Sequence, residues 1–327
     1  MKSLKFMAVT IMASSVLALA ACGNSGDTAK EGEKTEQTDK KLSGEIAIDG
    51  SSTVAPIGEA VSEEFSAENP DVKAPIGVSG TGGGFERFVA GETDISQASR
   101  PIKDEEAKAA KDAGIEYTEF KIANDGLSVV VSKENDFVKE LTVDQLQAMW
   151  TENGKAEKWS DIDPSWPKEE IKFYSPGTDS GTYDYFTEAI LEANDKKGNP
   201  MTKSATLSED DNVLVKGVQN DKNAIGYFGF SYYYENKDTM RAVPVVNEEG
   251  KAVEPNHDTI EDGSYNPLSR PLYIYVSNKS LQEKEQVKEF VKFYLENAAT
   301  LSEEVGYVKL PEDEAKEQMT KFEEATK

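Results

Sequence analysis

The chain has little of the side-chain chemistry on which most enzymes depend. Its 327 residues include one cysteine, Cys22, and one histidine, His257. No internal disulfide can therefore form, and no cluster of His and Cys ligands is available for a metal. The patterns GxSxG, HExxH and GxxxxGK[ST] are absent, which argues against a serine hydrolase, a zinc peptidase and a nucleotide P-loop. We therefore expect no catalytic residue, no metal and no cofactor, and interpret His257 as a surface residue.

Positive charge is also scarce. The chain carries 36 Lys and Arg against 61 Asp and Glu, a formal net charge of −25, and only four of the basic residues are arginines. An acidic surface is repelled by the phosphate backbone of nucleic acids, so we exclude nucleic acid as a partner. Most of the acidic residues are more simply interpreted as a solubilising surface.

The one long apolar run lies at the N-terminus. Residues 1–21 place two lysines ahead of apolar and small residues, in the form of a secretory signal. The sequence LAAC at its end resembles the bacterial lipoprotein processing box, which implies cleavage before Cys22 and a lipid on its sulfur. Residues 22–41 are polar and charged, and we expect a disordered tether. The expected location is the outer face of the cell membrane, in a Gram-positive bacterium.

Strand and helix patterns alternate along the rest of the chain. This alternation predicts an α/β fold with sheets flanked by helices. The polar segment 247–267 is predicted to be a loop. Strands are expected near residues 45–49, 72–78, 127–131, 171–174, 224–228, 241–246 and 272–276, and helices near 54–66, 85–89, 104–114, 142–150, 180–191, 211–219, 281–297 and 312–325.

Three loops share a composition of glycine and hydroxyl residues: GSST at 50–53, SGTGGG at 79–84 and TDSGT at 178–182. Each follows a predicted strand and precedes a predicted helix, at the sheet edge where α/β proteins bind ligands. Glycine lets backbone N–H groups converge, and Ser or Thr adds a hydroxyl that donates and accepts. Any one of these loops could merely cap a helix. Together they favour a small anion as ligand.

Arg100 is the arginine that we place nearest to such an anion. It lies in a loop at a predicted strand end, directly before Pro101. A guanidinium offers a planar fork of donors that fits two oxygens of a tetrahedral oxyanion. A role in an ion pair or in solvent is the alternative for every arginine of the chain.

Several segments together resemble a known family. GSSTVAP at 50–56, SGTGGGFERFVAGETDISQASRPI at 79–102, DSGTYDYF at 179–186 and AIGYFGF at 224–230 occur in the order found in the phosphate-binding lipoproteins of bacterial phosphate ABC importers. The resemblance implies a two-lobed periplasmic-binding-protein-like fold of type II, with each lobe a mixed sheet flanked by helices. Two crossing strands would join lobe 1, residues 42–124 and 268–327, to lobe 2, residues 125–267.

The resemblance also implies which residues hold phosphate. They are Ser52 and Thr53 in the first loop, Thr81 in the second, and Ser180, Gly181 and Thr182 in the third. Two positions depart from the enterobacterial-type pattern: Arg100 stands where that pattern has an aspartate, and Pro176 stands where it has an arginine. We interpret this as a positive charge that has moved from one lobe to the other.

The missing aspartate would accept the proton of hydrogen phosphate, which sulfate lacks. Asp179 and Asp125 are our candidates to replace it. Asp179 could instead cap the helix that follows, and Asp125 could satisfy a turn with Gly126. The expected partners are inorganic phosphate and the permease subunits of an ABC importer, with the protein itself a monomer. The alternatives are a binding protein for another tetrahedral oxyanion and a surface adhesin or interaction lipoprotein.

Overall fold

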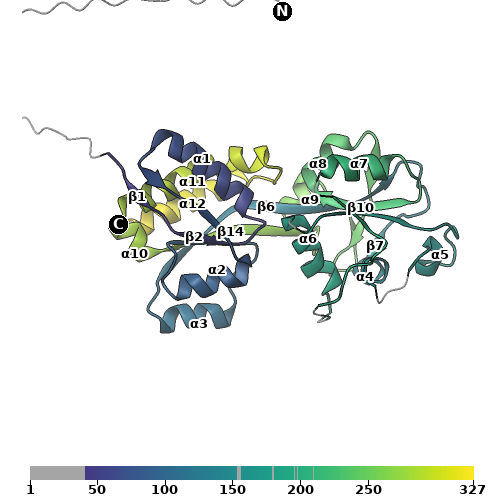
Figure 1. Ribbon diagram of the computed structural model, residues 1–327, viewed down its shortest axis with the longest axis horizontal. Coiled ribbons are helices and arrows are strands. Elements are labelled where there is room, and N and C mark those ends of the chain that lie inside the picture. The colour runs from purple at the N-terminus through teal and green to yellow at the C-terminus, as the bar shows by residue number, and fades with distance from the viewer. Residues whose placement is uncertain (1–40, 153–155, 179, 195, 197, 209) are drawn as a thin grey trace, which may run out of the picture. The chain divides into compact units, whose positions relative to one another are not determined.

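The computed structural model describes residues 41–152, 156–178, 180–194, 196, 198–208 and 210–327. Residues 41–327 form one compact unit, shown as a ribbon in Figure 1. The predicted leader, Cys22 and nearly all of the predicted tether lie outside the described residues, as does Asp179. None of the helices in the described part of the chain combines the length and apolarity needed to cross a bilayer.

Two large hydrophobic cores divide this unit into two lobes. The first core, which defines lobe 1, gathers residues from the start and the end of the described chain, including Phe65 and Phe290. The second core, which defines lobe 2, is built from the middle of the chain around Trp150, Phe186 and Tyr227. The Phe186 and Tyr227 rings stack with centroids 3.8 Å apart, and Trp150 meets both edge-on. The prediction of a two-lobed α/β fold is confirmed.

The sheet of lobe 1 is mixed, with parallel strands from its N-terminal part and one antiparallel strand from its C-terminal part, and helices pack against it. Its N-terminal elements are β1 (Gly44–Glu45), β2 (Ile48–Gly50), α1 (Ala55–Glu68), β3 (Val72–Lys73), β4 (Ile76–Val78), α2 (Gly80–Val89), β5 (Ile95–Ala98) and α3 (Asp104–Asp112). Its C-terminal elements are β14 (Ser269–Ser277), α10 (Asn278–Glu283), α11 (Glu285–Glu304) and α12 (Glu312–Ala325). Helix α1 buries Ile57, Val61 and Phe65, whose spacing of four residues places them on one face.

Lobe 2 follows the same plan with smaller elements. In chain order they are β7 (Leu141–Thr142), α4 (Val143–Trp150), α5 (Trp159–Ile162), β8 (Lys172–Pro176), α6 (Gly181–Phe186), a π-helix (Thr187–Leu191), β9 (Thr206–Ser208), α7 (Asp211–Gln219), β10 (Ala224–Gly229), α8 (Phe230–Asn236), β11 (Met240–Ala242), β12 (Val245–Val246), β13 (Ala252–Val253) and α9 (His257–Glu261). Helices α7 and α12 have the bounds predicted from the sequence.

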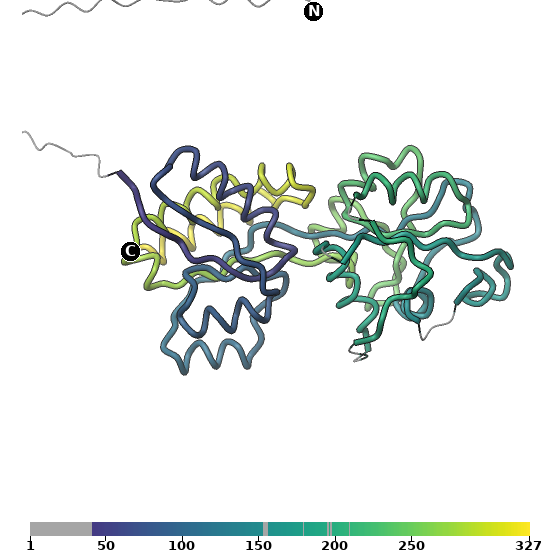
Figure 2. Tube along the Cα trace, in the orientation of Figure 1, coloured from purple at the N-terminus to yellow at the C-terminus, as the bar shows by residue number. Residues whose placement is uncertain are grey.

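Strands β6 (Tyr117–Ser132) and β14 carry the sheet from one lobe to the other. The first part of β6, to Gly126, pairs with β14, and the part from Leu127 onward pairs with β10 and β11. The result is one nine-stranded sheet with the order β4-β2-β5-β14-β6-β10-β8-β9, to which β11 is added beside β6. Figure 2 traces the chain along these two crossing strands.

Two local predictions were wrong. The glycine-rich segment 79–84 is not a loop, because helix α2 begins at Gly80. A Cβ at Gly84 would lie 2.6 Å from the Cα of Gly50, so this glycine serves close helix packing rather than a turn. The predicted loop 247–267 contains β13 and the short helix α9, which Asn256 and Thr259 start through a reciprocal capping box.

Other elements differ only in extent. The strand predicted at 127–131 is the second part of the longer β6, and the helix predicted at 180–191 becomes α6 followed by the π-helix. The strands predicted at 72–78 and 241–246 are each interrupted and form two short strands.

Candidate anion site between the lobes

The predicted ligand loops lie at the carboxyl ends of parallel strands. Strands β2, β4 and β5 are parallel in lobe 1, and β8, β9 and β10 are parallel in lobe 2. Strand β2 leads into residues 51–53, β4 into 79–81 and β5 into 99–100, while β8 leads into 177–182. Ligands of open α/β sheets bind at this edge.

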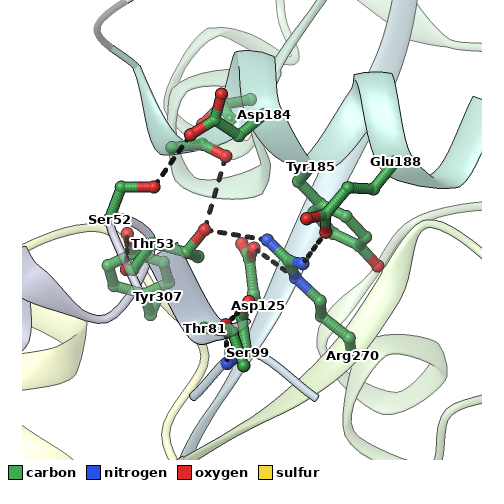
Figure 3. Close-up of polar contacts among 12 residues, drawn as sticks. Ser52, Thr53, Thr81, Ser99, Asp125, Asp184, Tyr185, Glu188, Arg270 and Tyr307 are labelled. Carbon is green, nitrogen blue, oxygen red and sulfur yellow. Dashed lines mark hydrogen bonds and ion pairs between the residues drawn. The ribbon is translucent and has the colours of Figure 1, made fainter. Parts of the chain in front are cut away.

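Two of these loops meet directly across the lobes, as Figure 3 shows. Ser52 Oγ donates a hydrogen bond to Asp184 Oδ2 at 2.9 Å, and Thr53 Oγ1 donates to the Gly181 carbonyl at 3.4 Å. A Cβ built on Gly181 would lie 2.9 Å from the Cα of Thr53, so a glycine is required for this approach. We call Ser52, Thr53, Gly181 and Asp184 the interlobe seam.

Arg270, at the start of the crossing strand β14, joins the seam to both lobes (Figure 3). Its Nη2 donates to Thr53 Oγ1 at 2.8 Å, and its Nη1 pairs with Glu188 of the π-helix at 3.2 Å. The guanidinium carbon lies 3.5 Å from the centroid of the Tyr185 ring. Only 12% of the side chain is exposed, so this cation is largely withdrawn from water.

Asp125, from the crossing strand β6, faces the same guanidinium. Its Oδ2 forms an ion pair with Arg270 Nε at 3.5 Å, but this buried nitrogen makes no well-aligned hydrogen bond among the described residues. Burial raises the pKa of Asp125, although the neighbouring guanidinium favours the charged form. A buried ion pair is costly unless its geometry is good and its polar atoms are hydrogen-bonded, and Arg270 Nε lacks such a hydrogen bond.

Tyr185 and Tyr307 supply buried phenols around this pair. Burial raises the pKa of both hydroxyls well above the ordinary value, so both stay protonated and act as donors. Tyr185 donates to the carbonyl of Pro267 at 2.8 Å, and Tyr307 donates to the carbonyl of Thr53 at 2.6 Å. Backbone carbonyls on both sides of the seam are thereby fixed.

The other predicted hydroxyl ligands are hydrogen-bonded within their own lobes. Ser180 Oγ accepts from the Thr182 amide at 3.2 Å and caps α6. Thr81 Oγ1 accepts from the Ser99 amide at 3.2 Å and lies 3.1 Å from Ser99 Oγ. These contacts fix the hydroxyls near the strand ends, and their contact with an anion stays a prediction.

Arg100 has a strong partner of its own. Its two terminal nitrogens each donate to one carboxylate oxygen of Glu106 at 2.8 Å, and its guanidinium carbon lies 5.5 Å from the Phe85 ring centroid. The hydrogen bonds that Arg100 donates to Glu106 raise the pKa of Arg100. The guanidinium of Arg100 therefore makes none of the seam contacts described above, and Arg270 is the arginine that contacts both lobes. A role for Arg100 at the anion stays a prediction.

Comparison with known proteins places this geometry in a family. Residues 35–298 match the model of a PBP superfamily domain. The phosphate-binding protein PstS of Staphylococcus saprophyticus is 46% identical over 324 residues, which cover 99% of this chain and 95% of that protein. The chain therefore belongs to the phosphate-binding proteins of the PBP superfamily.

Two solved structures support this family membership. A possible phosphate binding protein from Planctomyces limnophilus is 43% identical, with a TM-score of 0.83 and coverage of 88% of this chain and 100% of that chain. A putative phosphate ABC transporter substrate-binding protein from Clostridium perfringens, solved with bound phosphate, is 30% identical, with a TM-score of 0.55 and coverage of 82% and 100%. The two-lobed architecture described above is thus the architecture of the family.

Four residues of the site in this family member were not predicted from the sequence: Arg270, Asp184, Glu188 and Tyr307. Arg270 and Tyr307 lie outside the loops rich in glycine and hydroxyl groups, and Asp184 and Glu188 read as ordinary polar positions of the helix after the third loop. One signal could have identified Arg270. Both Arg100 and Arg270 occur in the tripeptide Ser-Arg-Pro, at 99–101 and 269–271; Arg100 follows the end of β5, and Arg270 lies at the start of β14.

Proposed function

We propose that this protein is an extracytoplasmic solute-binding protein that captures inorganic phosphate between its lobes and delivers it to an ABC permease. The observation that carries the proposal is the meeting of Thr53, Gly181 and Arg270 across the lobes. The names of the relatives reported above support phosphate as the ligand. Those names describe binding proteins, and we assign no enzymatic step to the chain.

The proposed lobe bounds are 42–124 with 268–327, and 125–267. The two separate cores support these bounds, since the first contains residues up to 123 and from 272 onward, and the second contains residues 127–268 together with Val308. Closure of the lobes would surround the anion with donors from both sides. This is how a chain of net negative charge can hold an anion, because surface charges are screened over about 8 Å while donors act at contact distance.

The proposed phosphate ligands are Ser52, Thr53, Thr81, Ser180, Gly181 and Thr182, with a guanidinium to balance charge. We assign the guanidinium to Arg270 in addition to Arg100. The reason is its position: Arg270 contacts Thr53, and its buried Nε makes only a 3.5 Å ion pair with Asp125 and no well-aligned hydrogen bond among the described residues. An anion at this point would accept a hydrogen bond from the guanidinium, which would then balance the charge of the anion as well as that of Asp125 and Glu188.

Asp125 and Asp179 are the proposed acceptors for the proton of hydrogen phosphate. Asp125 is supported by its burial, because only 10% of its side chain is exposed. A carboxylate held away from water accepts a hydrogen bond from a protonated oxygen but repels a fully ionised one. Phosphate carries such a proton at neutral pH, and sulfate does not.

The anchoring and the partners of the protein complete the proposal. Lipid on Cys22 and the tether from residue 22 to 41 would hold the protein, as a monomer, at the outer face of the cell membrane. The staphylococcal origin of the relatives supports a Gram-positive host. Labelling with a palmitate analogue, lost in Cys22→Ala, is the test of the anchor.

Calorimetric titration of the purified protein with phosphate and with sulfate tests the function. We expect phosphate to bind and sulfate to bind far more weakly. Failure of the wild-type protein to bind phosphate would reject the function, and tighter binding of molybdate or arsenate would change the assigned anion.

Paired variants then test the arginines. Arg270→Gln should weaken phosphate binding by about 10- to 150-fold, because a charge-assisted hydrogen bond contributes roughly 1.5–3 kcal/mol. Arg100→Gln is the matched comparison, since it removes the same group from a position where Glu106 already pairs it. A phosphate affinity equal to that of the wild type in Arg100→Gln would show that Arg100 does not bind the anion. The same result in Arg270→Gln would show that Arg270 does not.

A further inference from the structure

The segment Gly306–Val308, between α11 and α12, contacts both lobes. Val308 forms an antiparallel bridge with Asn124 of β6, in which backbone N–H groups donate in both directions at 2.7 and 2.9 Å. The Val308 side chain is buried in the core of lobe 2. Gly306 adopts φ of +93°, and a Cβ there would lie 2.7 Å from Ser231 Oγ on α8. A piece of chain that belongs to lobe 1 by sequence is therefore seated on lobe 2.

Tyr307 stands between these two contacts and faces the other way. Its ring packs against the core of lobe 1, and its hydroxyl donates to the carbonyl of Thr53 at 2.6 Å (Figure 3). Gly306 lies in a turn and Val308 pairs with β6, so the chain passes between the lobes at this segment, with the Val308 side chain in the core of lobe 2 and the Tyr307 ring against the core of lobe 1. Through this hydrogen bond, Tyr307 connects the first ligand loop, residues 50–53, to a segment that contacts both lobes.

The hydrogen bond from Tyr307 to the Thr53 carbonyl affects the contacts across the interlobe seam through the Thr53 peptide. Thr53 Oγ1 donates to the Gly181 carbonyl and accepts from Arg270, so its hydroxyl direction sets two contacts across the seam. Thr53 precedes helix α1, and its carbonyl is held by the Tyr307 hydroxyl from a distant part of the chain. A rotation of this peptide would turn the Thr53 side chain away from both partners.

We propose that Tyr307 is a positioning residue for anion binding, which fixes the Thr53 peptide and couples it to the contact of the 306–308 segment with lobe 2. Tyr307 acts through Thr53 and does not touch the anion. The inference rests on the proposed function for its effect on affinity, but its effect on the first ligand loop is independent of which anion binds.

Tyr307→Phe is the variant that tests this role, because it removes the hydroxyl and keeps the ring in the core. Tyr294→Phe is the control, since Tyr294 is a buried phenol of α11 in the same core. We expect phosphate affinity, measured by calorimetry well below the melting temperature, to fall about tenfold in Tyr307→Phe. It should stay within twofold of wild type in Tyr294→Phe. Equal affinities in the two variants would overturn the proposal.

Hydrogen exchange of the ligand-free protein supplies a second readout. In Tyr307→Phe the amides of residues 51–58 should exchange at least about threefold faster, because the loop loses its tie, while the rest of lobe 1 stays protected. A variant that only lowers global stability would raise exchange throughout the lobe, and that result would also overturn the proposal. If wild-type protein fails to bind phosphate, the proposed function is wrong, and unchanged exchange at residues 51–58 then rejects the positioning role separately.

Discussion

The substitution Gly181→Ala tests whether the lobes close on each other at the interlobe seam. The added Cβ would lie 2.9 Å from the Cα and 3.0 Å from the amide nitrogen of Thr53, and both are backbone atoms that cannot rotate away. Carbon atoms pack at about 3.5–4.0 Å, so the two loops must separate by about 0.6 Å or more. The hydrogen bond from Thr53 Oγ1 to the Gly181 carbonyl, already 3.4 Å long, would then be lost.

Gly181→Ala should destabilise only the arrangement in which the two lobes are closed on each other. Overpacking costs roughly 1–3 kcal/mol, and each 1.4 kcal/mol changes an equilibrium constant tenfold, so phosphate affinity should fall about 5- to 150-fold. Calorimetry measures the affinity, and thermal unfolding without ligand checks that each lobe is intact. Gly229→Ala is the control, because a Cβ at Gly229 would meet only the Tyr232 ring at an ordinary 3.9 Å. Affinity of Gly181→Ala within twofold of wild type would refute the closure described here.

Three further predictions concern stability. Gly50 has a φ of +146°, and Gly50→Ala would place a methyl group 2.1 Å from the carbonyl oxygen of Gln97. The free energy of unfolding in urea should therefore fall by more than about 3 kcal/mol. A smaller decrease would contradict the close packing of Gly50 against Gln97. Arg241→Ala removes hydrogen bonds of 3.1 and 2.9 Å to the Asn135 carbonyl and should cost about 1–3 kcal/mol, yet leave phosphate affinity within twofold. The folded-state pKa of Asp125 lies above the ordinary value of 3.8. Between these two pKa values, the folded state binds more protons at Asp125 than the unfolded state does. The contribution of Asp125 to the free energy of unfolding therefore falls as pH rises. The free energy of unfolding of Asp125→Asn minus that of the wild type should therefore increase from about pH 4 upward. A difference that does not change with pH would contradict the raised pKa of Asp125.

Much of the fold could be predicted because apolar spacing directly reports a buried face. Helix α1 illustrates this, since Ile57, Val61 and Phe65 recur on one side. The glycines of 79–84 misled the prediction because composition does not distinguish a turn from close packing. Gly84 is needed where α2 passes over Gly50, a contact between segments distant in sequence.

The candidate site was only partly predictable for a related reason. Ser52, Thr53 and Gly181 could be found because strand ends and loop composition are local properties. The direction of a long side chain is not local: Arg100 lies at a strand end as predicted, but its guanidinium pairs with Glu106. Arg270 lies far along the sequence and reaches the same region because β14 runs beside both β5 and β6.

The continuous sheet has a mechanical consequence. Strand β6 pairs with β14 in its first part and with β10 and β11 in its second part. The lobes therefore move apart by bending a hydrogen-bonded sheet and not by reorientation about a flexible linker. The register shift between Leu272 and Tyr273 is the point where that sheet is already irregular and bends most easily. We therefore expect a stiff hinge of small amplitude, and a single cooperative heat-absorption peak for both halves of the molecule.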